Sequence, residues 1–200
     1  MFKPIDRRTA LTNLALIIGG AALLPACDKP AGKASIALKK ISIDADQEQF
    51  IADVAETIIP KTDTPGAKDL KVHLFVMKMV DDCFSPDDQK AFVDGLDKMA
   101  KQAKDKLGKP FGQATQQQRE AFLTEIDNKK IQQKKDSQVK GKSGNATPQD
   151  DVLAFYSMVK GETIFGYTYS KYFMTKQIVY ELVPGRYNPK LPVSQLKRVS

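Results

Sequence analysis

Apolar residues recur at spacings of three and four through most of the chain after Asp46, and this helical periodicity limits the fold more than any other feature. No run of alternating apolar and polar residues is long enough to predict a sheet. We therefore expect an all-α fold, a small helical domain of about five helices over residues 46–200. Its C-terminal tail should be extended, because Pro184, Pro189 and Pro192 restrict the backbone there.

Residues that favour helix ends delimit the predicted helices. They span residues 46–59, 69–83 and 86–107, with two more opening at 115–118 and at 147–148. Pro60 ends the first helix, Ser85 caps the third, and Gly108 follows it as a C-cap. The polar, Lys-rich residues 129–145 predict a solvated extension and loop after the fourth helix. Gly161 and Gly166 weaken the continuation of the fifth.

The first 26 residues have the parts of a bacterial export signal, namely positive charges, an uncharged stretch and a final small residue. Arg7 and Arg8 stand together, with Leu11 three positions further on, which is typical of a twin-arginine signal. An ordinary secretory leader with two incidental arginines is the alternative. The uncharged stretch has 17 residues, fewer than the roughly 20 of a spanning helix, so we expect cleavage rather than a permanent span.

Residues 24–27, Leu-Pro-Ala-Cys, resemble a bacterial lipobox and predict lipid attachment at Cys27. Several acyl chains would hold the protein lastingly at a membrane. Asp28 resembles the signal that retains lipoproteins in the inner membrane. We therefore expect a lipid-anchored protein on the periplasmic side of that membrane. Residues 27–45, rich in Lys, Ala and Gly, should be the lipidated cysteine and a flexible tether.

No motif in the chain nominates a catalytic, cofactor-binding or metal-binding residue. The single histidine, His73, has no cysteine or second histidine at ligand spacing, which favours a structural or surface role. Cys83 is expected to be a small buried apolar residue rather than a nucleophile. Asp87 and Asp88 fall in a first helical turn, where the helix dipole favours negative charge. The formal net charge of +7 indicates a solvated Lys-rich surface, because no nucleic-acid motif accompanies it.

Aromatic residues are densest in residues 166–173, near the end of the predicted helical region. Tyr167, Tyr169, Tyr172 and Phe173 are candidates for contact with a partner, because aromatic side chains are enriched at protein interfaces. Aromatic side chains also fill protein cores, and the sequence leaves both interpretations open.

Three separated segments together resemble the gluconate 2-dehydrogenase subunit 3 family, over roughly residues 47–192. The most specific is Thr-Asp-Thr-Pro-Gly-Ala at 62–67, which follows Ala-Glu-Thr-Ile-Ile-Pro at 55–60. The others are residues 92–96 with 108–111 and 116–118, and residues 166–170 leading to Tyr180 and 184–187. Two features depart from the family pattern: the Lys-rich stretch around residues 129–142 is long, and a lipobox is not general.

The resemblance implies a non-catalytic small subunit of a membrane-associated, periplasm-facing dehydrogenase of the gluconate, sugar or alcohol type. Its expected partner is a large flavin-dependent subunit that carries FAD, often joined by a cytochrome c subunit that carries haem c. The small subunit would escort the large one through the twin-arginine route, help it mature or support it structurally. The alternative is a stand-alone periplasmic lipoprotein that scaffolds or binds a ligand in the cell envelope.

Overall fold

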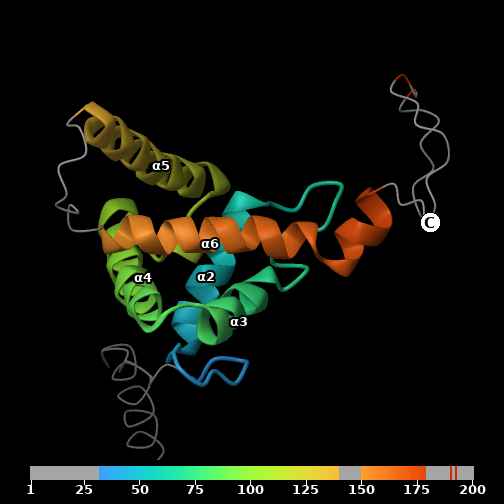
Figure 1. Ribbon diagram of the computed structural model, residues 1–200, viewed down its shortest axis with the longest axis horizontal. Helices are drawn as coiled ribbons and strands as arrows, with labels where there is room; N and C mark the ends of the chain where they lie inside the picture. The colour runs from blue at the N-terminus through green and yellow to red at the C-terminus, as the bar shows by residue number, and fades with distance from the viewer. Residues whose placement is uncertain (1–31, 140–149, 179–189, 191, 193–200) are drawn as a thin grey trace, which may run out of the picture. The chain divides into compact units, whose positions relative to one another are not determined.

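The computed structural model describes residues 32–139, 150–178, 190 and 192, and within these ranges the chain is helical without any named strand (Figure 1). The α-helices are α2 (Ala45–Ile58), α3 (Val72–Cys83), α4 (Pro86–Leu107), α5 (Gln116–Val139) and α6 (Asp151–Thr168). A 3₁₀ turn, η1 (Phe111–Gln113), precedes α5, and a short π-helical segment, η2 (Phe173–Gln177), follows α6. The prediction of an all-α domain of about five helices is confirmed.

Several residues named from the sequence lie outside the described ranges. They are the export and lipidation residues Arg7, Arg8, Cys27 and Asp28, and most of the C-terminal tail. Among the described helices, none combines the length and the apolar content that crossing a bilayer requires.

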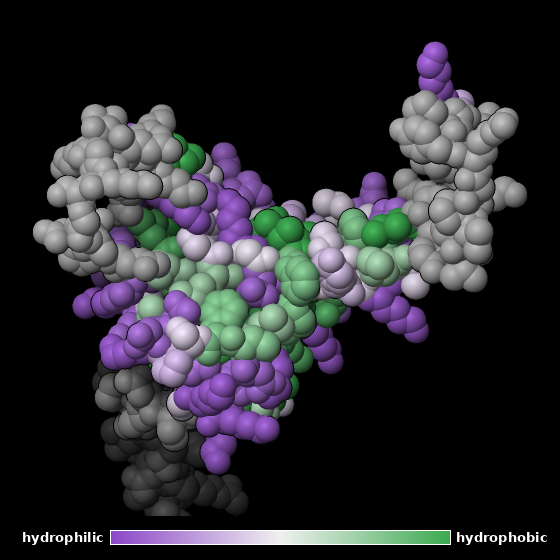
Figure 2. Space-filling model, in the orientation of Figure 1, coloured by the Kyte–Doolittle hydropathy of each residue, from purple (hydrophilic) through white to green (hydrophobic). Residues whose placement is uncertain are grey.

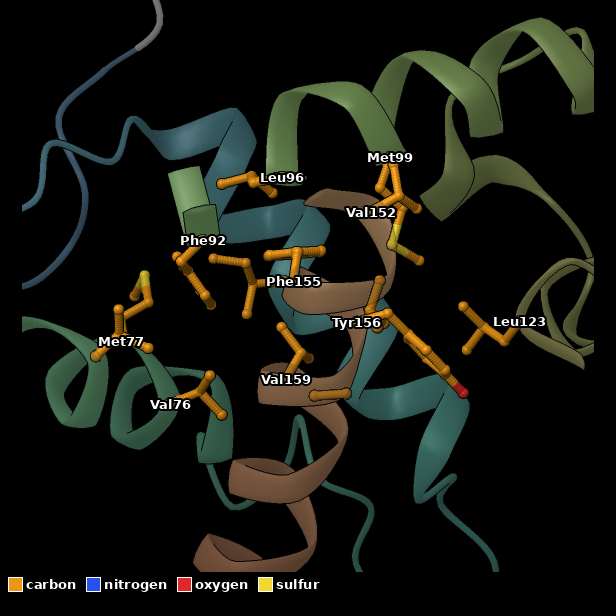
Figure 3. Close-up of a cluster of buried hydrophobic side chains, with 14 of the residues drawn as sticks. Val76, Met77, Phe92, Leu96, Met99, Leu123, Val152, Phe155, Tyr156 and Val159 are labelled. Atoms are coloured by element: carbon orange, nitrogen blue, oxygen red, sulfur yellow. The ribbon is translucent and has the colours of Figure 1, made fainter. Parts of the chain in front are cut away.

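The core forms around α6, which packs against α2, α3, α4 and α5 (Figure 1). Phe155 and Val159 of α6 lie among buried side chains of α3 and α4 in Figure 3, and all of them are fully buried. The rings of Phe155 and Phe92 lie 4.9 Å apart between their centres. Burial of each such side chain contributes about 1.5–3 kcal/mol, so α6 is held mainly by the core.

Most helix ends follow the sequence closely, although α6 begins at Asp151, after an N-cap at Asp150, and not at residues 147–148 as predicted. Ser85 Oγ accepts the Asp88 N–H at 3.2 Å, and Gly108 adopts the left-handed conformation at φ 67°. The second helix, however, begins at Val72 rather than at residue 69. Lys71 has φ 54°, outside the helical region, and the Val72 N–H donates to the Ala67 carbonyl in a turn.

Two later helices are longer than expected. α6 passes through both Gly161 and Gly166, which were expected to weaken it. Burial of one side of α6 outweighs the roughly 1 kcal/mol that each helical glycine costs. α5 continues to Val139 through the Lys-rich stretch, so the expected extension is helical as far as that residue.

The chain before α2 is not a free tether throughout. Ile41 and Ile43 are buried in the core, and the Asp81 carboxylate accepts the backbone N–H groups of Lys39, Lys40 and Ile41 at 2.9, 2.7 and 3.1 Å. Burial alone would raise the pKa of Asp81, but these three donors and Lys78 lower it to about 2. The expectation of a flexible tether up to residue 45 is therefore wrong for residues 33–44.

Candidate functional site

Exposed apolar side chains concentrate at one end of α6. Five large apolar side chains are exposed among the described residues, and four of them lie between residues 164 and 174. These four are Ile164, Phe165, Tyr169 and Met174, whereas the fifth, Ile131, lies on α5. Apolar surface gathers over α6 and α3 on the face shown in Figure 2. A helix that ends with so much uncovered apolar area is a candidate for contact with another protein.

Three rings on this part of the molecule, Phe75, Phe165 and Tyr169, form what we call the aromatic surface. The ring centres of Phe75 and Phe165 are 5.9 Å apart, and those of Phe165 and Tyr169 are 4.4 Å apart. Gly166 permits this arrangement, because a Cβ at that position would lie 2.6 Å from Cδ1 of Phe75. The aromatic surface therefore joins the end of α6 to the start of α3.

The aromatic residues singled out from the sequence divide between core and surface. Tyr169 is 67% exposed, whereas Tyr167 is buried and donates its hydroxyl to the Pro65 carbonyl at 2.9 Å. Phe173 lies edge-on to Tyr167 and packs against the core. Tyr172 is half-buried, and its hydroxyl accepts the Gln177 side-chain N–H at 2.8 Å. Tyr167 and Phe173 thus support the surface from within, and Tyr169 belongs to it.

Sequence reasoning missed the other two rings of the aromatic surface. Phe165 could have been found, because it lies four residues before Tyr169 and therefore on the same helical face. Phe75 belongs to a helix that is distant in sequence, and only the packing of α3 against α6 brings it there.

The loop over residues 60–67 holds the end of α6 in place. The Glu56 carboxylate accepts the N–H groups of Lys61 and Lys68 at 2.9 and 2.8 Å on either side of this loop. A Cβ at Gly66 would lie 2.4 Å from Glu56 Oε1, so any larger residue there would displace that carboxylate. Pro65 then offers its carbonyl to Tyr167. A hydrogen bond therefore joins the loop to the last turn of α6, which carries part of the aromatic surface.

Glu162 lies one turn before the aromatic surface on α6. One of its carboxylate oxygens, Oε2, is buried and has no hydrogen-bond partner among the described residues. Burial raises the pKa of this carboxyl. Asp127, which pairs with α6 from α5, is different, because its carboxylate accepts the Tyr156 hydroxyl at 2.9 Å and the Lys160 ammonium at 2.7 Å.

The side chains with possible catalytic or metal-binding chemistry do not form a common site among the described residues. The His73 side chain is mostly buried, with Nε2 3.7 Å from Glu48 Oε1, and burial lowers its pKa although Glu48 opposes this. Cys83 is exposed at the end of α3, so the prediction that it is buried is wrong. Asp87 and Asp88 occupy the first turn of α4, as expected. No three His, Cys, Asp or Glu side chains in the described ranges are grouped as metal ligands.

An open cleft of about 690 Å³ lies elsewhere, between α2, α4 and η1. Three of its four carboxylates are already hydrogen-bonded within the chain. Asp53 pairs with Lys68 at 2.8 Å, Asp97 accepts from the Gln47 side chain at 2.7 Å, and Asp44 caps α2. Most of the carboxylates of the cleft are therefore engaged within the chain.

Comparison with known proteins identifies one family. The family model described as gluconate 2-dehydrogenase subunit 3 matches residues 45–185, which include the loop at 60–67, α6 and all three rings of the aromatic surface. No curated protein and no solved structure matches the chain.

Proposed function

The chain belongs to the gluconate 2-dehydrogenase subunit 3 family and is a subunit of a dehydrogenase complex, and from this we propose that it is the non-catalytic accessory subunit. In this proposal it binds the large flavin-dependent subunit through the aromatic surface. The complex oxidises gluconate, a sugar or another alcohol on the periplasmic side of the inner membrane.

The observation that carries the proposal is the exposure of large apolar side chains at the end of α6. Phe165 and Tyr169 stand on a helix fixed by the core and by the bond from Tyr167 to Pro65. Rigid aromatic side chains lose little conformational entropy on binding, and such residues supply much of the energy of protein interfaces. A subunit that must hold a larger partner needs this kind of surface.

The cofactors of the complex belong, in this proposal, to the other subunits. FAD lies in the large subunit, and a cytochrome c subunit, where present, carries haem c. The isolated small subunit is then colourless and does not oxidise sugars with an artificial electron acceptor. An absorption spectrum and an acceptor-reduction assay of the purified protein test this, and a yellow, red or active subunit would contradict it.

The N-terminal leader supports the proposed location of the complex at the inner membrane. Arg7 and Arg8 would direct a folded complex of both subunits through the twin-arginine route, and Cys27 would anchor it, with Asp28 favouring the inner membrane. Changing both arginines to lysine keeps the positive charge. The change should therefore block export of both subunits only if the export system recognises the arginine pair itself. Cys27→Ala should move the complex from the detergent phase to the aqueous phase. Unchanged export or unchanged partitioning would contradict the respective step.

The direct test is purification of the native protein from membranes with identification of what accompanies it. We expect a flavoprotein at a constant ratio to this chain. The alternative, a stand-alone periplasmic lipoprotein that scaffolds or binds a ligand, predicts that no dehydrogenase subunit accompanies it.

A further inference from the structure

Glu162 is an anomaly among the carboxylates that α6 contributes or contacts. Leaving a buried oxygen without a hydrogen bond costs about 1–3 kcal/mol. Asp127 avoids that cost through a hydroxyl and an ammonium, yet Glu162 Oε2 has no partner among the described residues. A carboxylate that finds no partner among the described residues would gain most from a binding partner that supplies the opposite charge.

The position of Glu162 ties it to the aromatic surface. Phe165, Gly166 and Tyr169 follow it at three, four and seven residues, which is the spacing of one helical face. Gly166 directs this face toward Phe75, since a Cβ there would meet that ring. A carboxylate and three rings therefore share one side of α6 and the start of α3.

We propose that the aromatic surface receives a segment of the large subunit that presents an arginine between apolar residues, and that Glu162 pairs with this arginine. This inference rests on the proposed function, because it specifies what the docking segment must carry. Glu162 thereby becomes a residue that determines which segment fits.

The chemistry of the surface selects this occupant. A wholly apolar segment would bury Glu162 more deeply and leave its charge unpaired, which is unfavourable. A cation removes that penalty, and a guanidinium suits this surface better than an ammonium. It is more weakly hydrated than an ammonium, and it stacks on rings such as those of Phe165 and Tyr169 while its charge pairs with the carboxylate.

Substitution of Glu162 by glutamine tests the pairing, because it removes the charge and keeps the shape. We expect Glu162→Gln to weaken binding of the purified large subunit at least tenfold, measured by titration calorimetry with the mature protein. The same variant should be at least as resistant to thermal unfolding as the wild type, because it removes the charge from a carboxylate whose buried Oε2 has no partner among the described residues. A purely structural role for Glu162 predicts the opposite, a loss of stability.

Glu120→Gln is the matched control, since Glu120 is an exposed glutamate on α5 that accepts a bond from Gln116. It should leave the affinity unchanged within a factor of two. Equal binding by wild type and Glu162→Gln would overturn the arginine pairing while leaving the proposed function intact. Failure of the wild type itself to bind the large subunit would instead contradict the proposed function.

Discussion

Two carboxylates, Asp81 on α3 and Glu162 on α6, show how differently this domain treats buried charge. Asp81 is fully buried, and three backbone N–H groups of the segment before α2 point at it. Glu162 has a buried oxygen with no hydrogen-bond partner in the part of the chain that the structure describes, and it lies on the helical face that carries exposed rings. A carboxylate that is satisfied within the chain stabilises the fold, whereas an unsatisfied one beside exposed aromatic side chains indicates a contact outside it.

The largest effect on stability should come from the satisfied carboxylate. Asp81→Ala removes the acceptor of three backbone N–H groups, of which that of Ile41 is buried, so we expect the free energy of unfolding to fall by about 3 kcal/mol. Asp82→Ala, at the exposed neighbour, should change it by less than about 1 kcal/mol. Urea denaturation measures both. Similar effects of the two variants would contradict the claim that the hydrogen bonds to Asp81 stabilise the fold.

The pH dependence of the Asp81 effect follows from its lowered pKa. A carboxyl with a depressed pKa in the folded state adds stability that is present above its unfolded pKa of about 3.8. That stability is lost as the pH falls through the folded pKa of about 2. The difference between wild type and Asp81→Ala should therefore shrink between pH 4 and pH 2.

Two glycines of α6, Gly161 in its interior and Gly166 near its C-terminal end, give the next largest effect. A Cβ at Gly166 would press on the Phe75 ring, whereas nothing lies within 4 Å of a Cβ at Gly161. Gly166→Ala should destabilise the domain by about 1 kcal/mol and weaken partner binding by moving Phe75. Gly161→Ala should stabilise it by about 0.5–1 kcal/mol and leave binding unchanged. Thermal unfolding and calorimetry distinguish these outcomes, and equal effects would show that the Phe75 contact is unimportant.

The sequence predicted the helices well because local patterns determine them. Ser85 and Gly108 mark the ends of α4 by the same hydrogen-bonding and steric rules that operate in any helix. The errors arose where tertiary contacts outweigh local preference. Packing carries α6 through Gly166, and Asp81 holds residues that look like a free tether, although these partners lie about 40 residues apart in sequence.

The candidate site was predictable only in part, for the same reason. The many aromatic residues at 166–173 predict Tyr169 as a contact residue, and its side chain is exposed. Helical spacing alone does not tell that Tyr167 turns inward to Pro65, since the sequence does not show which face of α6 the core covers. Phe75 and Glu162 became visible only once α3 and α6 were placed together.

His73 gives the smallest expected effect and tests whether an unpaired atom alone indicates a contact. Its Nδ1 is buried and has no hydrogen-bond partner within the described ranges, but the ring lies with Nε2 near Glu48 and not on the aromatic surface. Burial lowers its pKa below 6.5, so the unfolded chain takes up the proton first, and stability should decline as the pH falls below about 6.5. His73→Gln should flatten this decline, seen by thermal unfolding at pH 5 to 8. An altered affinity of this variant for the large subunit would contradict the claim that the partner contacts only the aromatic surface.

The central claim is that the aromatic surface binds the large subunit while the rest of the domain holds it in place. The most direct test is the affinity of the double variant Phe165→Ala/Tyr169→Ala for the purified large subunit, beside Ile131→Ala, which removes an exposed apolar side chain from α5. We predict a loss of at least a hundredfold for the double variant, none for Ile131→Ala, and unchanged helical content in both. Undiminished affinity in a folded double variant would contradict the account.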